Sequence, residues 1–323
     1  MTEEVVPAEP PPANAVRPEP VASKPSSPWP APGNVAVVSL LTDYGSEDGF
    51  VGALHSVLRR ALPQVPIIDL THAIARQDVR AGSLALRRAA PYLAPGVVVA
   101  VVDPGVGTSR RGVAVEPVGG PGVVFVGPDN GLLPPAVDAL GGAGRCVELE
   151  DRGYWLSAPG PTFAGRDIFT PAAAQLAGGA ALVDLGKPVA PESLVRLPPP
   201  LVARAGDGSC ETEVTLVDRF GNVQLAATPS DLSGTAEAAD PCEVGDPSES
   251  AVVEVTALEV TGPRGPFEAR KARVFADLAP RQLGLLVDSY GHLALVLNGA
   301  SAAHVLGIKE GEVVVLRSVG DKL

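Results

Sequence analysis

Five polar side chains have the types and positions that ligand binding or proton transfer requires. Each follows a short apolar run, in or beside a polar turn: they are Asp43, Asp69, His72, Asp103 and Asn130. In an open α/β sheet, ligands bind beyond the carboxyl ends of the strands, so the sequence predicts that these side chains converge there. The alternative is that the Asp and Asn residues simply initiate turns.

Other kinds of chemistry lack their residue patterns. No loop matches GxGxxG or GxxxxGK[ST], which argues against hydrolysis of a nucleoside triphosphate. No serine lies in a GxSxG turn, and the chain has only four histidines. His72 lies close to Asp69, but no HxH, HxxxH or HxxE spacing supplies a third ligand. The sequence therefore predicts no metal site and a structural role for His72.

The elements that must position these side chains are short strands and amphipathic helices. The runs VAVVSLL, VPIIDL, GVVVAVVD and GVVFVG are typical of strands buried on both faces. Between them, GFVGALHSVLRRALPQ and DVRAGSLALRRAAPYL place apolar residues on one face and arginines on the other, as helices do. This alternation predicts an α/β domain with a largely parallel sheet.

The pattern changes near residue 200. Segments such as ETEVTLVDRFGNVQLAA and LGLLVDSYGHLALVLN show short β runs with almost no helical signal. The predicted organisation is a disordered Pro-rich tail at residues 1–34, an α/β domain at 35–195 and a smaller, barrel-like all-β domain at 196–323. The tail lacks the basic and apolar regions of a secretion signal, so we expect a cytoplasmic protein.

Composition excludes several classes of partner. The chain of 323 residues has a net charge of −12, which makes nucleic acid a poor partner. No apolar run approaches the roughly 18 to 20 residues that span a bilayer, so we expect no membrane segment. The three cysteines, Cys146, Cys210 and Cys242, are widely spaced, which fits a reducing compartment.

Seven motifs, in order, resemble those of the S-adenosyl-L-methionine (SAM) hydroxide adenosyltransferase family, whose relatives include the fluorinase and the chlorinase. They are TDYGSEDGFVG, DLTHAIARQDVRAG, VVDPGVGTSRR, GPDNGLL, TFAGRDIFTPAAA, VDRFGNVQL and DSYGHLALVLNGASAAHVLGIKEGE. The resemblance spans about residues 35 to 320. It implies a homotrimer, with active sites where the first domain of one subunit meets the second domain of a neighbour.

The resemblance also implies the reaction and its binding residues. Water or hydroxide attacks the ribose C5′ of SAM, which releases adenosine and L-methionine, and no metal or cofactor takes part. Asp43 matches the ribose-binding aspartate. The matching residues of the second domain are Asp218 and Ser289 for the methionine end, Phe220 and Asn222 for the adenosine loop, and Asn298 and Gly299 for the adenine edge.

The nucleophile site departs from the family pattern. The resemblance implies an Asp, Arg and His set, and Asp103 and Arg110 match its first two members. A guanidinium lowers the cost of a nearby anion, so this pair suits a carboxylate or an incipient hydroxide. The family motif TFHGRD reads TFAGRD here, which puts Ala164 where the histidine stands. Alanine neither accepts a proton nor hydrogen-bonds to water.

We therefore expect an adenosine-forming SAM hydrolase and weigh two alternatives. One is a non-catalytic family member that still binds SAM or adenosine. The other is a SAM-dependent halogenase, which is disfavoured because Asp103 is retained and a carboxylate beside the nucleophile repels halide.

Overall fold

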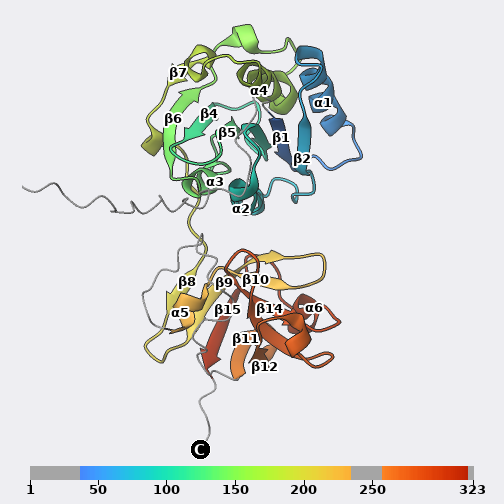
Figure 1. Ribbon diagram of the computed structural model, residues 1–323, viewed down its shortest axis with the longest axis vertical. Helices are drawn as coiled ribbons and strands as arrows, with labels where there is room; N and C mark the ends of the chain where they lie inside the picture. Colours follow the sequence, from blue (N-terminus) through green and yellow to red (C-terminus); the bar gives the residue numbers. More distant parts are fainter. Residues whose placement is uncertain (1–36, 234–256, 319–323) are drawn as a thin grey trace, which may run out of the picture. The chain divides into compact units, whose positions relative to one another are not determined.

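The computed structural model describes residues 37–233 and 257–318 of the chain (Figure 1). These residues form two β-sheets, one from residues 37–188 and the other from residues 202–318. The predicted tail at residues 1–34 lies outside the described residues.

The first sheet has seven strands in the order β2-β1-β3-β5-β4-β6-β7. The strands are β1 (Val37–Thr42), β2 (Ile67–Thr71), β3 (Gly96–Val101), β4 (Gly112–Pro117), β5 (Val123–Pro128), β6 (Ala143–Glu148) and β7 (Lys187–Pro188). Strands β2, β1, β3 and β5 are parallel neighbours, and only β4 and β7 oppose the direction of the other five. The predicted α/β domain with a largely parallel sheet is confirmed.

Helices cover both faces of this sheet (Figure 1). They are α1 (Phe50–Ala61), α2 (Val79–Ala89), α3 (Pro134–Asp138) and α4 (Thr170–Ala177). Successive residues of β3 point to opposite faces: Val99 packs in one core cluster with Leu58 of α1, and Ala100 packs in another with Leu86 of α2. Burial on both faces explains why the central strands read as continuous apolar runs.

The two long helices form where the sequence supplies an apolar face and suitable ends. In α1, Leu54 and Leu58 are one turn apart and fully buried, while the last turn carries two arginines that complement the helix dipole. Asp78 caps the N-terminus of helix α2: its carboxylate accepts a hydrogen bond from the Ala81 N–H at 2.9 Å. Both helices are predicted by the spacing, and both are confirmed.

The second sheet closes into a barrel of seven strands because β9 pairs with β10 as well as with β15. Strand β8 extends the sheet beside β9. The strands are β8 (Val202–Arg204), β9 (Cys210–Val217), β10 (Val223–Leu225), β11 (Ala257–Gly262), β12 (Gly265–Lys271), β13 (Leu283–Val287), β14 (Leu293–Leu297) and β15 (Val313–Ser318). The short helices here are α5 (Pro229–Ser233) and α6 (Ala302–Leu306). The predicted all-β, barrel-like domain is confirmed.

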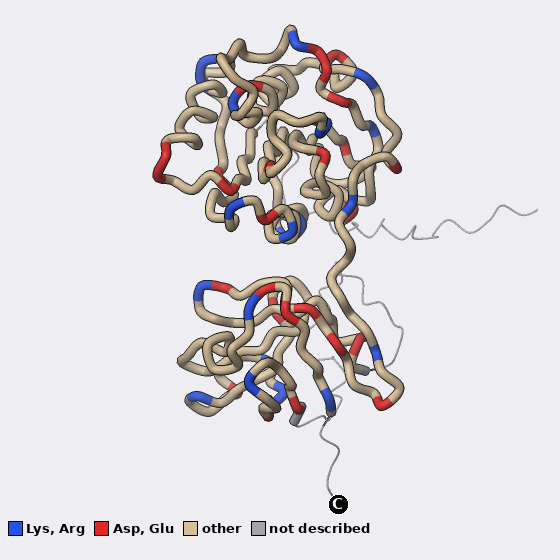
Figure 2. Tube along the Cα trace, turned by 180° about the vertical axis from the view of Figure 1, so that it is seen from behind, with Lys and Arg blue, Asp and Glu red and all other residues tan. Residues whose placement is uncertain are grey.

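Charged residues of both signs are interspersed along the described chain (Figure 2). Among the described residues, no helix has the length and apolar character needed to cross a membrane.

Candidate active site

A cavity of about 290 Å³ lies at the carboxyl edge of β1 and β3, just below the roughly 300 to 1,000 Å³ range of small-ligand sites. Its lining consists of Asp43, Tyr44, Asp48, Phe50, Arg76, Gln77, Asp103, Val106, Thr162, Phe163, Ala164 and Gly165. The cavity thus brings together Asp43, Asp103 and Ala164, three of the residues expected at the active site from the sequence. It lies where the topology of an open α/β sheet places ligands.

The carboxylate of Asp43 is held by a backbone donor. Its Oδ2 accepts a hydrogen bond from the Gln77 N–H at 2.8 Å. Gln77 has φ of 61°, in the left-handed region that costs a non-glycine residue about 1 to 3 kcal/mol. This conformation presents the N–H of Gln77 to Asp43.

Asp103 and Arg110 form a two-point ion pair at the cavity wall. Arg110 Nε donates to Asp103 Oδ1 at 3.1 Å, and Arg110 Nη2 donates to Oδ2 at 2.5 Å. The Asp103 side chain is only 5% exposed and that of Arg110 13%, so water screens the pair weakly. Arg110 also donates to the Arg111 carbonyl at 2.7 Å, which fixes the guanidinium.

Burial raises the pKa of Asp103 above its usual value, while the charge and hydrogen bonds of Arg110 oppose the rise. The nearby Asp43 carboxylate adds to the rise. A carboxylate of this kind is a better proton acceptor than an exposed one, and Arg110 keeps it oriented.

Three aromatic rings of the lining form a cluster. The ring centroids of Tyr44 and Phe50 lie 5.6 Å apart, those of Tyr44 and Phe163 5.6 Å, and those of Phe50 and Phe163 4.9 Å. Burial raises the pKa of Tyr44, so its hydroxyl is neutral and can donate a hydrogen bond at ordinary pH. Residue spacing does not predict this cluster, although Tyr44, Phe50 and Phe163 all lie in the motifs that resemble those of the family.

Ala164 lies at the start of a π-helical turn, Gly165–Phe169, which continues into α4. It is 6% exposed and presents a methyl group to the cavity lining. Turns of this kind often occur at functional sites. The adjacent Arg166 and Asp167 pair with each other at 2.6 Å, the structural contact that their adjacency predicts.

Gly165 allows the Tyr44 hydroxyl to approach the turn. A Cβ atom at this position would lie 2.3 Å from Tyr44 Oη, which no real contact permits. We expect Gly165→Ala to displace the tyrosine and to lower unfolding free energy by about 1 to 3 kcal/mol, with weaker ligand binding. Gly160→Ala is the matched control, because nothing lies within 4 Å of its Cβ position. Equal melting temperatures for the two variants would contradict this expectation.

The residues predicted in the second domain do not line this cavity. Asp218 organises the turn between β9 and β10: its Oδ1 accepts from the N–H groups of Phe220 and Asn222, both at 2.9 Å, and its Oδ2 accepts from Asn222 Nδ2 at 2.8 Å. Phe220 is 74% exposed at the tip of the turn. The turn therefore presents an aromatic ring on a rigid support.

Ser289 lies in a similar turn between β13 and β14. Here Asp288 Oδ1 accepts from the N–H groups of Tyr290 and His292, at 2.8 and 3.0 Å. Asn298 and Gly299 follow the other end of β14, where Asn298 Nδ2 donates to the Leu278 carbonyl at 2.7 Å. The ligand-binding roles implied for these second-domain residues stay predictions.

Two family models match the chain. The SAM hydroxide adenosyltransferase N-terminal domain matches residues 38–186, and the C-terminal domain of the same name matches residues 212–315. These two ranges contain the cavity and most of the barrel strands, respectively.

Similarity to individual proteins points to the same family. The chain is 46% identical over 276 residues to an (R)-S-adenosyl-L-methionine hydrolase of Salinispora tropica, covering 85% of this chain and 95% of the relative. It is 25% identical over 300 residues to a fluorinase of Actinopolyspora mzabensis, covering 85% of this chain and 95% of the fluorinase. A crystal structure of an uncharacterized conserved protein from Thermotoga maritima aligns with a TM-score of 0.74 and 31% identity, covering 87% of this chain and all of that one. The chain therefore belongs to the SAM hydroxide adenosyltransferase family.

Proposed function

We infer that this protein hydrolyses SAM to adenosine and L-methionine. The observation that carries the inference is the buried Asp103–Arg110 pair at the wall of the cavity, in a chain 46% identical to a hydrolase of that name. A carboxylate fixed by a guanidinium can hold a water molecule in one orientation, as in-line attack on a carbon atom requires.

The reaction is a single displacement. A new bond forms between the water oxygen and ribose C5′ while the bond from C5′ to the sulfonium sulfur breaks, and its electron pair leaves on sulfur as the neutral thioether of methionine. Asp103 orients the water and accepts the proton that it loses, for eventual release to solvent. Asp43 binds the ribose hydroxyls, and the aromatic lining limits the access of other water molecules.

The positive sulfonium already makes methionine a good leaving group. For this reason we propose that the reaction uses no organic cofactor and no catalytic metal. The halogenase alternative is disfavoured by the same carboxylate, because a halide ion next to Asp103 would meet a like charge in a poorly screened site. The non-catalytic alternative is favoured by one observation, the methyl group of Ala164 where a third polar group would stand.

Product analysis separates these functions. Purified protein is incubated with SAM, with and without chloride, and the products are resolved by chromatography. Adenosine and methionine in equal amounts support the hydrolase. A 5′-halogenated nucleoside would identify a halogenase, and binding of SAM without turnover would identify a binding protein.

We further propose a cytoplasmic homotrimer, with each active site shared between two subunits. Three observations support sharing: the cavity is lined by first-domain residues, the residues matched to the methionine and adenine ends belong to the barrel, and Phe220 is exposed on its turn. An exposed aromatic ring on a rigid turn is suited to contact a partner surface.

Mixing two inactive variants tests this arrangement. Asp103→Ala disables the first-domain half of a site and Asp218→Ala the second-domain half. When both are coexpressed with different tags, random cyclic trimers should regain about a quarter of the wild-type sites, since each site takes its halves from neighbouring subunits. A site built within one chain predicts no recovery. The two variants expressed separately are the controls.

A further inference from the structure

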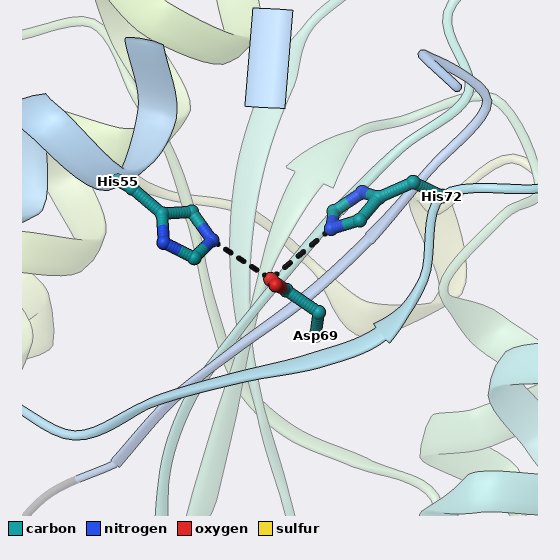
Figure 3. Close-up of side chains that lie close together, drawn as sticks. All are labelled: His55, Asp69 and His72. Atoms are coloured by element: carbon teal, nitrogen blue, oxygen red, sulfur yellow. Dashed lines mark hydrogen bonds and ion pairs between the residues drawn. The ribbon is translucent and has the colours of Figure 1, made fainter. Parts of the chain in front are cut away.

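A cluster of two histidines and one aspartate lies beside the cavity, outside its lining. Asp69 Oδ1 on β2 lies 2.9 Å from His55 Nε2 of α1 and 3.1 Å from His72 Nε2, just after β2 (Figure 3). One potential ligand atom from each of the three residues lies within 4.8 Å of the other two. Figure 3 shows both rings directed toward the same carboxylate.

The hydrogen bonds of this cluster are incomplete. His55 Nε2 is hydrogen-bonded to Asp69. His72 Nε2 is buried and lacks a well-aligned hydrogen bond, although the same carboxylate is 3.1 Å away. A buried polar atom that lacks a well-made hydrogen bond lowers stability, so a ligand bound to this nitrogen would stabilise it.

The other ring nitrogen of His72 already has a partner. His72 Nδ1 lies 2.8 Å from Thr42 Oγ1 at the end of β1. With Nδ1 protonated and donating to this hydroxyl, the neutral ring has its lone pair on Nε2, the atom that points toward Asp69. A hydrogen bond of this kind at the far nitrogen is the usual support of a metal-binding histidine.

We propose that His55, Asp69 and His72 bind a divalent transition metal ion, with Zn²⁺ as the best-matched ion. Two ligands about 2.1 Å from one ion are about 3.0 to 3.4 Å apart in octahedral or tetrahedral geometry, close to the separations of 2.9 and 3.1 Å found here. The two histidine nitrogens lie within 4.8 Å of each other, so side-chain movements that bring them closer together would create the site. Asp69 is 42% exposed and His55 34%, which leaves an approach for the ion and room for water ligands.

An ion at this site would have a structural role, because the cluster is hydrogen-bonded to a segment that lines the cavity. Thr42 Oγ1 also accepts from the Tyr44 N–H at 3.1 Å, and the Gly45 N–H donates to the His72 carbonyl at 2.8 Å. These bonds connect the cluster to the segment that carries Asp43 and Tyr44. A bound ion would tie α1, β2 and this segment together without touching the reacting atoms.

Titration of the untagged, chelator-treated full chain with Zn²⁺ tests the proposal by calorimetry, with Co²⁺ absorption as a second readout. We expect saturable binding of one ion per chain, and a Co²⁺ spectrum without the charge-transfer band of a thiolate ligand. That band would reveal binding by a cysteine, including Cys242, which lies outside the described residues. His55→Gln and His72→Gln should each abolish binding, and Thr42→Val should weaken it about 10- to 100-fold.

His304→Gln is the matched control, because His304 is an exposed histidine on α6 in the barrel. Its Zn²⁺ affinity should equal that of the wild type. His55 lies on a partly exposed helix surface, so His55→Gln should fold, and an unchanged melting curve without metal would verify this. Absence of saturable Zn²⁺ binding overturns the proposal, as does a wild-type affinity in both His55→Gln and His72→Gln. Neither result bears on SAM hydrolysis.

Discussion

Asp103→Ala should lower the rate of adenosine formation by about 10²- to 10⁴-fold, equivalent to about 3 to 5 kcal/mol of activation free energy. The carboxylate is 5% exposed and held at two points by Arg110, so it has one fixed position at the cavity wall. Its removal takes away both the orientation of the water and the acceptor for its proton. The loss should appear in single-turnover rates, because the chemical step is the one affected.

Two further variants identify the cause of this loss. Asp103→Asn keeps the shape of the side chain and should be slowed nearly as much, since an amide does not accept the proton. Glu116→Gln breaks another carboxylate–arginine pair, that of Glu116 on β4 with the exposed Arg145 on β6, and should leave the rate unchanged. A wild-type rate in Asp103→Ala would contradict the assigned role.

The raised pKa of Asp103 leads us to expect that the reaction rate depends on pH. Burial raises the pKa of Asp103 above the ordinary value of about 3.9, so protonation begins at a higher pH than for an exposed aspartate. The ionised form is the active one. The single-turnover rate should therefore fall as pH is lowered through this raised pKa, and the acidic limb should be missing in Asp103→Asn.

Ala164→His should raise turnover by as much as about 10²- to 10⁴-fold, the usual contribution of a positioned acid or base. Ala164 borders the same cavity as Asp103, so an imidazole there adds a hydrogen-bond partner for water close to the carboxylate. SAM affinity should change little, because the groups assigned to ribose and adenine remain. Single-turnover adenosine formation and equilibrium binding of SAM measure the two quantities separately.

Ala164→Leu is the matched control for this gain. It adds comparable volume next to the π-helical turn but no proton acceptor, so it should not accelerate the reaction. Ala164 is 6% exposed and packs in the core as well as at the cavity, and the larger side chain costs both variants about 1 to 3 kcal/mol of stability. If the wild type and Ala164→His both form no adenosine, the binding-protein alternative replaces the hydrolase.

The short apolar runs in the sequence are sufficient to predict the central strands of the first sheet. The four quoted apolar runs correspond to β1, β2, β3 and β5, which are adjacent and parallel in the sheet. Their shared direction places Asp43 and Asp103 at one edge, as predicted, whereas Asp69, His72 and Asn130 do not line the cavity. Asn130 instead has the turn role given as the alternative: its Nδ2 donates to the Val102 carbonyl at 2.8 Å, and its Oδ1 accepts from the Leu132 N–H at 3.2 Å. Strand β4 was not among the predicted strands, and its antiparallel pairing with β5 and β6 depends on tertiary contacts that no local run specifies.

Parts of the site depended on contacts between distant residues. Phe163 joins Tyr44 and Phe50 only because the π-helical turn packs at the end of β1, more than a hundred residues away in sequence. His55 meets Asp69 because α1 packs beside β2, and a separation of 14 residues matches no metal-binding motif. Spacing rules apply within one element, whereas these groups come from several.

The hydrogen bond from Gln77 to Asp43 makes the support of this carboxylate independent of the side chain at position 77. The donor is a main-chain N–H, so exchanging the side chain at position 77 does not delete it, and only proline lacks the group. Gln77 is nevertheless one of the residues that line the cavity. Position 77 is therefore a place where substrate preference can be redesigned, with glycine, asparagine and aspartate the replacements that best tolerate its backbone angle.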